Sequence, residues 1–86
     1  MKKLVKVEEV EGEGLIGLMG ETVTLFCLNY IYSGKLVGVN ATCVKLDDAY
    51  IVYETGGLKD KSFKDAQSIG DGHYVQTQAI ESFRKR

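Results

Sequence analysis

The sequence predicts a mainly β domain in which four or five short antiparallel strands curl into a small barrel. Apolar and polar residues alternate over 21–30 and over 43–54, which is the period of a half-buried strand. Between these segments, Gly34 and Gly38 interrupt a strand-like run. Glycines inside a strand usually mark a bend or a close backbone approach. A short sheet that bends in this way is a candidate for closure into a barrel.

The residues before the first strand are expected to form a lead-in. Over 1–14 the apolar and acidic residues fit a short strand and a helical turn equally well, and this choice stays open. The segment 15–20 contains too much glycine for a good helix, so we expect it to pack over the barrel mouth. The first strand follows at 21–30, where Val23 and Leu25 point to one side.

Two further strands follow in the middle of the chain. We expect a turn at 30–34, a bent strand at 35–40 and a long strand at 43–54. Asp47 and Asp48 interrupt the long strand, and charged residues in that position often mark a bulge or an edge.

The last third of the chain predicts a polar excursion and two short strands. The excursion covers 55–72, contains one weak strand at 62–69 and ends in the glycine turn at 70–72. Short strands are expected at 73–77 and 80–83.

The chain length and the net charge limit the number of domains and the ways in which the protein could bind nucleic acid. The chain has 86 residues, which suits one domain, and a formal net charge of -1 at pH 7. A domain of this size buries only about 60% of the surface of its unfolded chain, so oligomerisation would add needed stability. The near-neutral charge argues against binding nucleic acid by bulk charge. Any contact with nucleic acid therefore has to be local.

The cysteines do not indicate a metal site or a disulfide framework. Cys27 and Cys43 lie in apolar runs, and we expect two buried free thiols in a reducing compartment. One histidine in the chain is too few to complete a four-ligand zinc set with them. No secretory signal or long apolar span is found. We therefore expect a cytoplasmic protein without membrane contact, metal or cofactor.

The stretch 34–49 carries a pattern of glycines and apolar residues that follows the first strand. Its matching positions are the strand 23–27, then Gly34, Leu36, Gly38, Asn40 and 46–49. This pattern resembles the first motif of the Sm and LSm family, which includes the bacterial Hfq proteins. Asn40 takes the position of the family's Asp, and the turn that follows is one residue shorter than the family pattern.

A second, weaker pattern lies near the end of the chain. Val75, Ile80 and Phe83 have the spacing of the apolar positions in the second Sm motif. Gln76 and Thr77 stand where that family has Arg and Gly.

The resemblance implies a strongly bent, five-stranded antiparallel Sm-like barrel of the SH3 type, with an N-terminal lid, assembled into a homo-oligomeric ring. In that family the fourth strand of one subunit pairs with the fifth strand of the next. The segments near 74–77 and 80–83 would be these edges. The whole chain would be one domain, divided into an extension 1–14, a first-motif region 15–54, a variable loop 55–72, a second-motif region 73–83 and a basic tail 84–86.

The resemblance also implies a set of nucleotide-binding residues. Sm-like rings hold a base between the turn of the first motif and the loop of the second. The amide and hydroxyl side chains at these positions are Asn40, Thr42, Gln76, Thr77 and Gln78. Such groups hydrogen-bond the edges of unpaired bases. The positions lack the family's Arg and an aromatic residue in the turn, and the alternative that both segments are only polar turns stays open.

Aromatic side chains elsewhere are a further source of base contacts. The five tyrosines are Tyr30, Tyr32, Tyr50, Tyr53 and Tyr74. Every base has a face on which an aromatic ring can stack. Tyrosines of a small barrel are more often half-buried, with the hydroxyl exposed to solvent.

No catalytic constellation is found. Asp47 and Asp48 are neighbours in a strand and point to opposite faces, so they cannot act together on one substrate atom. His73 follows a glycine turn and is expected to be a solvated turn residue. We predict a non-catalytic ring that binds single-stranded RNA, or DNA, in processing or as a chaperone. The alternative is an oligomeric protein-interaction scaffold.

Overall fold

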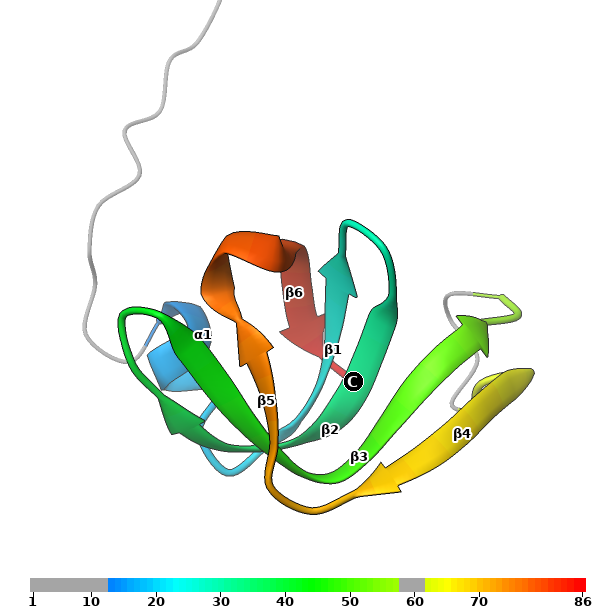
Figure 1. Cartoon of the computed structure of the whole chain (residues 1–86), viewed down its shortest axis with the longest axis horizontal. Helices are drawn as coiled ribbons and strands as arrows, with labels where there is room; N and C mark the ends of the chain where they lie inside the picture. Colours follow the sequence, from blue (N-terminus) through cyan, green and yellow to red (C-terminus); the bar gives the residue numbers. More distant parts are fainter. Residues whose placement is uncertain (1–12, 58–61) are drawn as a thin grey trace, which may run out of the picture.

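The fold is a curved antiparallel sheet of six strands preceded by one short helix, in a computed structural model that describes residues 13–57 and 62–86 (Figure 1). The elements in chain order are α1 (Gly14–Gly17), β1 (Thr22–Cys27), β2 (Ile31–Val39), β3 (Cys43–Glu54), β4 (Asp65–Gly70), β5 (His73–Gln76), the 3-10 helix η1 (Thr77–Ala79) and β6 (Ile80–Lys85). This confirms the mainly β class. Most of the predicted 1–14 segment lies outside the described residues.

The long strand β3 organises the sheet. Its first part, 43–46, pairs with β5, and its second part, 49–54, pairs with β4. On its other side β3 pairs with β2, which continues the order to β1 and β6. Because β4 and β5 share one edge of β3, they behave as two halves of a single strand that is interrupted by the turn between them.

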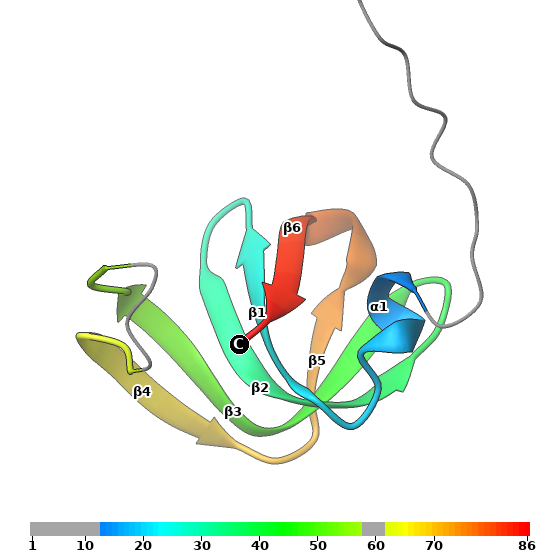
Figure 2. The ribbon, with the colours of Figure 1, turned by 180° about the vertical axis from the view of Figure 1, so that it is seen from behind.

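The predicted five-stranded barrel is not seen as a barrel, because the sheet formed by the described residues stays open and has six strands. Within the described residues, β5 pairs only with β3, and β6 pairs only with β1. The two strands are consecutive and joined by η1, but no ladder connects them (Figure 2). The strand count rises to six because the turn after Gly70 divides β4 from β5.

The second strand starts earlier than the sequence predicts. The segment 30–34 is not a turn, because β2 already begins at Ile31. The actual turn is tighter, and the Cys27 N–H donates to the Tyr30 carbonyl oxygen at 3.0 Å. Gly34 lies inside β2, where the chain passes close to β3.

The core lies on the concave side of the bent sheet. Its buried members are Val23, Leu25, Leu36, Val44, Leu46, Ala49 and Val75. Leu15 and Leu18 pack against this cluster, so the lead-in covers it as expected. It does so with one helical turn, α1, which lies beside the β2–β3 turn (Figure 2). The prediction that 15–20 would avoid helix is therefore wrong at its first residues, because packing of Leu15 stabilises a turn that glycine disfavours.

Asp48 forms a bulge in the middle of β3, which is one of the two alternatives, bulge or edge, that the paired acids predicted. Its φ of 46° is left-handed, and the β2–β3 register shifts between the pairs at Ser33 and Lys35. The Asp48 N–H donates to Oδ1 of Asp71 at 2.8 Å, and the Gly72 N–H donates to Oδ1 of Asp47 at 2.9 Å. The bulge in β3 and the turn between β4 and β5 therefore hold each other in place.

The bulge also changes which residues of β3 face the core. Simple alternation predicts that Val44, Leu46 and Tyr50 share one side of the strand. Instead Val44 and Leu46 are fully buried before the bulge, and Ala49 is fully buried after it. The extra residue at the bulge shifts the alternation there, so that Ala49 takes the core position and Tyr50 is only half-buried.

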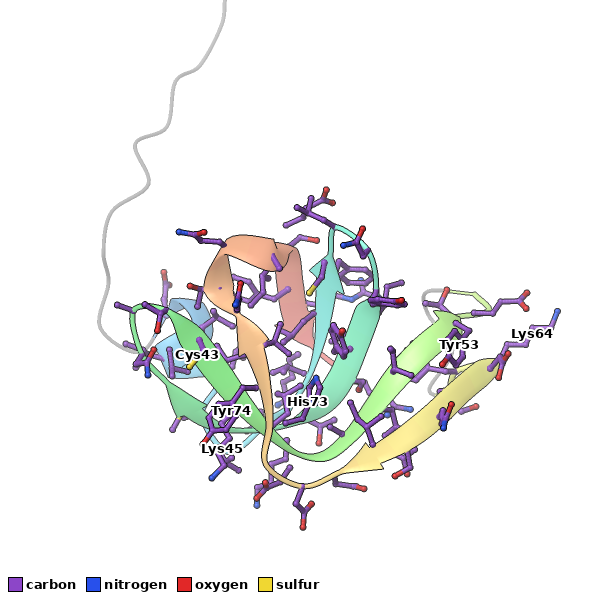
Figure 3. The ribbon with its side chains drawn as sticks, viewed as in Figure 1. Cys43, Lys45, Tyr53, Lys64, His73 and Tyr74 are labelled. Carbon is purple, nitrogen blue, oxygen red and sulfur yellow. The ribbon has the colours of Figure 1, made fainter. Side chains whose placement is uncertain are left out.

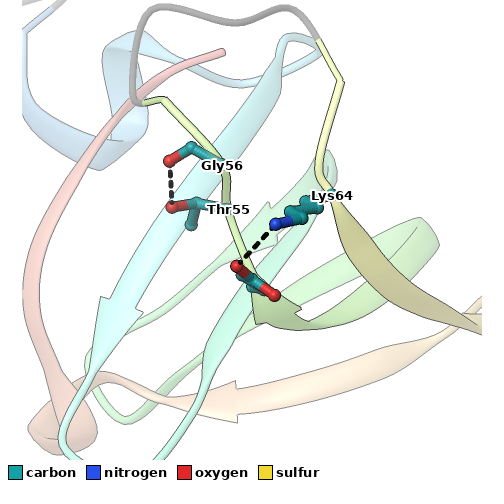
Figure 4. A network of polar contacts seen from close by, with 4 residues as sticks. Thr55, Gly56 and Lys64 are labelled. Carbon is teal, nitrogen blue, oxygen red and sulfur yellow. Dashed lines mark hydrogen bonds and ion pairs between the residues drawn. The ribbon is translucent and has the colours of Figure 1, made fainter.

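The β3–β4 pair extends beyond the core as an arm. At its far end Lys64 Nζ lies 3.3 Å from Oε1 of Glu54, and the Thr55 hydroxyl donates to the Gly56 carbonyl oxygen (Figure 4). Both charged side chains are more than half exposed, so this ion pair contributes little stability.

We predict that Gly34→Ala destabilises the fold by about 1–3 kcal/mol, because a Cβ at this position overpacks the contact with β3. That atom would lie 3.0 Å from the Asp47 carbonyl oxygen and 3.1 Å from Ala49 Cα. Gly38→Ala is the matched control, since its Cβ would come no closer than 3.4 Å to Lys45 Cβ. Urea unfolding measures the difference in unfolding free energy between the two variants. Equal unfolding midpoints would contradict the inference that Gly34 is needed where β2 passes close to β3.

We predict that Asp47→Ala and Asp71→Ala each cost about 1 kcal/mol, because each removes one hydrogen bond to a backbone N–H. The double variant should lose less than the sum, since both bonds join the same pair of bends. Asp65→Ala, an exposed change at the start of β4, is the control. Strictly additive urea midpoints would show that the two bonds act independently.

Candidate functional site

Asn40 builds the β2–β3 turn. Its Oδ1 accepts hydrogen bonds from the Thr42 N–H at 2.8 Å, the Cys43 N–H at 2.9 Å and the Thr42 hydroxyl at 3.1 Å. Side-chain bonds of this kind replace backbone turn contacts, which is why Asn is common in turns. The side-chain carbonyl oxygen of Asn40 is thus engaged within the turn.

The 3-10 helix η1 is attached directly to this turn. The Thr77 N–H donates to the Thr42 carbonyl oxygen at 2.9 Å, and the Thr77 hydroxyl donates to the Ala41 carbonyl oxygen at 3.1 Å. One residue therefore joins two segments that are far apart in the sequence. The first-motif turn and the second-motif loop lie side by side in the structure.

A pocket of about 430 Å³ opens at this junction. It is lined by Ala41, Thr42, Cys43, Tyr74, Gln76, Thr77 and Gln78. Four of the five candidate residues are thereby brought together. Asn40, the fifth, is exposed but is not part of the lining, because its side chain folds back on the turn.

The strand pair β3–β5 supplies the outer wall of the pocket. Cys43 is the cross-strand partner of Gln76, and Lys45 is the partner of Tyr74. Cross-strand partners share a face, and neighbours along a strand point oppositely. The four side chains therefore lie on the face opposite Val44 and Val75, away from the core. Figure 3 shows Cys43, Lys45 and Tyr74 along these two strands.

Tyr74 is the site residue that sequence reasoning did not assign. Its side chain is 61% exposed and borders the pocket, with the Lys45 Nζ 5.7 Å from the ring centroid. The signal was present in the sequence, because Tyr74 stands two residues before Gln76 in a strand and so shares its face. The expectation that the tyrosines are half-buried holds for Tyr32 and Tyr50, while Tyr30 and Tyr53 are exposed like Tyr74.

His73 is part of the packed structure. It is the first residue of β5 and is only partly exposed, with its ring centroid 5.2 Å from that of Tyr32. The prediction of a solvated turn residue is therefore wrong, because β5 begins directly after Gly72. Among the described residues, no group of three or more His, Cys, Asp or Glu side chains could hold a metal ion.

The two cysteines are free and partly buried, where full burial was expected. Burial raises the pKa of the Cys27 thiol above its ordinary value, and the nearby Glu81 carboxylate adds to the rise. Burial likewise raises the pKa of Tyr32, with further contributions from Cys27 and Tyr30. Cys27 is thus a protonated packing residue near neutral pH, while Cys43 borders the pocket.

We predict that Cys27 reacts slowly with iodoacetamide, because the raised pKa lowers the thiolate fraction. In a Cys43→Ser background at pH 8, native protein should be alkylated more slowly than protein unfolded in urea, as measured by mass spectrometry. The fold favours the protonated thiol, so its contribution to stability is present below the ordinary cysteine pKa and is lost as the pH rises past the raised value. Equal native and unfolded rates would contradict this environment for Cys27.

None of the helices in the described part of the chain has the length and apolar composition that crossing a bilayer requires. No protein-family model and no curated protein sequence matches the chain. The pocket and the strands around it are therefore the features that bear on function.

Proposed function

We propose that this chain is a non-catalytic, Sm-like protein that binds single-stranded RNA, or single-stranded DNA, in the pocket between the β2–β3 turn and η1. The observation that carries the proposal is the meeting of four amide and hydroxyl side chains, from two distant segments, around one pocket. They are Thr42, Gln76, Thr77 and Gln78. The two glutamine amides both donate and accept hydrogen bonds, and the hydroxyl oxygens of Thr42 and Thr77, whose hydrogens are donated within the turn, can still accept. This set suits the mixed edge of an unpaired base.

The arrangement of elements supports the Sm-like part of the proposal. A short helix precedes the sheet, and β2 and β3 are bent at Gly34 and at the Asp48 bulge. If β4 and β5 are counted as one interrupted strand along β3, the strands number five, as the resemblance implies. The short η1 joins the last two strands.

The proposed assembly is a homo-oligomeric ring. In the described part of the chain, β5 and β6 each use only one edge for pairing. Unpaired edges invite pairing with another chain, and a repeated contact of this kind closes into a ring when the rotation fits. The edge near 74–77 of one subunit would pair with the edge near 80–83 of the next. Repetition of the pocket around the ring would raise affinity for one long strand through effective concentration.

The proposed role is nucleic-acid processing or chaperoning in the cytoplasm. The near-neutral charge of the chain requires that binding come from local contacts in the pocket. Such contacts suit a protein that takes up and releases single strands.

An interaction scaffold is the second candidate. Ile16 and Leu28 are large apolar side chains that are 69% and 67% exposed. Pull-down of a protein partner that survives nuclease treatment, with no oligonucleotide binding, would favour the scaffold.

We predict that the wild-type protein binds labelled U-rich or A-rich oligonucleotides in low salt. Gln76→Ala should weaken this binding by about 5- to 10-fold, because one hydrogen bond to a base edge contributes about 1 kcal/mol. Gln67→Ala is the matched control, because Gln67 lies on the β3–β4 arm near Tyr53. Fluorescence anisotropy at low and moderate salt gives the affinities. Absence of binding at tens of micromolar by an assembled ring would refute the proposed function.

We predict that the protein is an oligomer by light scattering at micromolar concentration and that Phe83→Pro dissociates it. The Arg86 N–H donates toward β1, so by alternation the N–H of Phe83 points to the free edge of β6. Proline removes that donor. Phe83→Ala, which keeps the N–H, is the control, and circular dichroism checks the fold of both variants. A monomeric wild-type protein would contradict the ring.

A further inference from the structure

We infer that Tyr74 and Lys45 form a combined stacking and phosphate subsite on the outer face of β3 and β5, so that the proposed site holds a nucleotide through its base and backbone together. The inference rests on the proposed function and deepens it. The four amide and hydroxyl side chains around the pocket include neither an aromatic ring nor a cation. Tyr74 supplies the ring and Lys45 supplies the cation.

The Tyr74 ring is exposed at the edge of the pocket. Tyr74 lies in β5, where its partner across the ladder is Lys45, and its side chain borders the pocket while remaining 61% exposed. A large aromatic ring that is mostly solvated on a rigid strand has exposed π surface at little conformational cost. Every base can stack on such a surface, whatever its hydrogen-bonding edge.

The Tyr74 ring lies on the same strand as the Gln76 amide. Tyr74 and Gln76 are two residues apart on one face of β5, which corresponds to about 7 Å along the strand. A base stacked on Tyr74 would therefore have its edge within reach of the Gln76 amide. The stacking contact of Tyr74 and the hydrogen bonds of Gln76 to the base edge would therefore involve the same base.

The Lys45 ammonium group lies close to the Tyr74 ring. Its Nζ lies 5.7 Å from the Tyr74 ring centroid, and its partner on β2 is Gly38, which has no side chain to cover it. Within the described residues, Lys45 makes no ion pair with a carboxylate. Asp47, two residues further along β3, accepts the Gly72 N–H and is not paired with Lys45 in the described part of the chain. The ammonium thus lies over the Tyr74 ring, so a base would stack on the part of the ring that Lys45 does not cover, with the ammonium near its phosphate.

The resulting ligand class is a single strand with unstacked bases. Duplex nucleic acid offers phosphates to Lys45 but keeps its bases stacked on one another, so Tyr74 has nothing to stack against. A free nucleobase lacks the phosphate. The subsite therefore favours single-stranded oligonucleotides over both.

The test compares oligonucleotide binding by the wild type, Tyr74→Leu, Tyr74→Phe and Lys45→Met, using fluorescence anisotropy. Tyr74→Leu should weaken binding by about 5- to 150-fold, the range expected for loss of one stacked base, and Tyr74→Phe should retain it. Tyr53→Leu is the matched control, because Tyr53 is 58% exposed on the β3–β4 arm and should leave affinity unchanged. Lys45→Met should lower the slope of log affinity against log salt by about 0.7 for each phosphate charge that Lys45 neutralises.

A measurement on the wild type alone protects the test against a variant that fails to fold. An oligonucleotide that carries 2-aminopurine should lose fluorescence on binding when that base stacks on tyrosine, and an abasic site at the same position should weaken binding.

The outcomes separate the two proposals. If the wild type binds and Gln76→Ala weakens binding, while Tyr74→Leu and Lys45→Met bind as the wild type, the subsite is refuted and the proposed function stands. Unchanged 2-aminopurine fluorescence on bound oligonucleotide would also refute the subsite. If the wild type binds no single-stranded oligonucleotide, both the subsite and the proposed function fail.

Discussion

The reciprocal hydrogen bonds of Asp47 and Asp71 hold together the two bends on which this fold depends. Each carboxylate accepts a backbone N–H from the opposite bend, one in the β3 bulge and one in the turn between β4 and β5. A left-handed residue such as Asp48 is strained unless its surroundings hold it, and its N–H is one of the two donors. The same contact therefore stabilises the bulge and sends β5 back along the first half of β3.

The position of the pocket follows from this constraint. Because β5 pairs with residues 43–46 of β3, the end of β5 lies next to the β2–β3 turn. Thr77, which follows β5, donates hydrogen bonds there to the carbonyl oxygens of Ala41 and Thr42. The same pairing places Tyr74 opposite Lys45 on the outer face. The polar residues of the pocket and the aromatic residue beside it thus have one structural origin. Their proposed use in binding a single strand needs no residue of the core.

The open sheet connects the fold to the proposed assembly. Packing of the buried cluster curves the sheet far enough to enclose Leu25 and Leu36, yet the described strands β5 and β6 do not pair with each other. A domain of this size has little spare stability and two exposed edges. Association through those edges would address both problems and would repeat the pocket at each subunit.

The grouping of two polar segments as one candidate site came from the resemblance to the Sm family, while the sequence by itself determined the mainly β class, the bounds of the long strand at 43–54 and the disturbance at Asp47 and Asp48. These follow from local signals, namely alternation, glycine turns and charge inside a strand. Only the tertiary structure decided that Gly34 is a close approach within β2, that the bulge places Ala49 in the core and that the sheet stays open. It also brought Tyr74 to the pocket. These features depend on the pairing of strands that are distant in the sequence. Such pairing leaves no periodic pattern in the sequence of either strand.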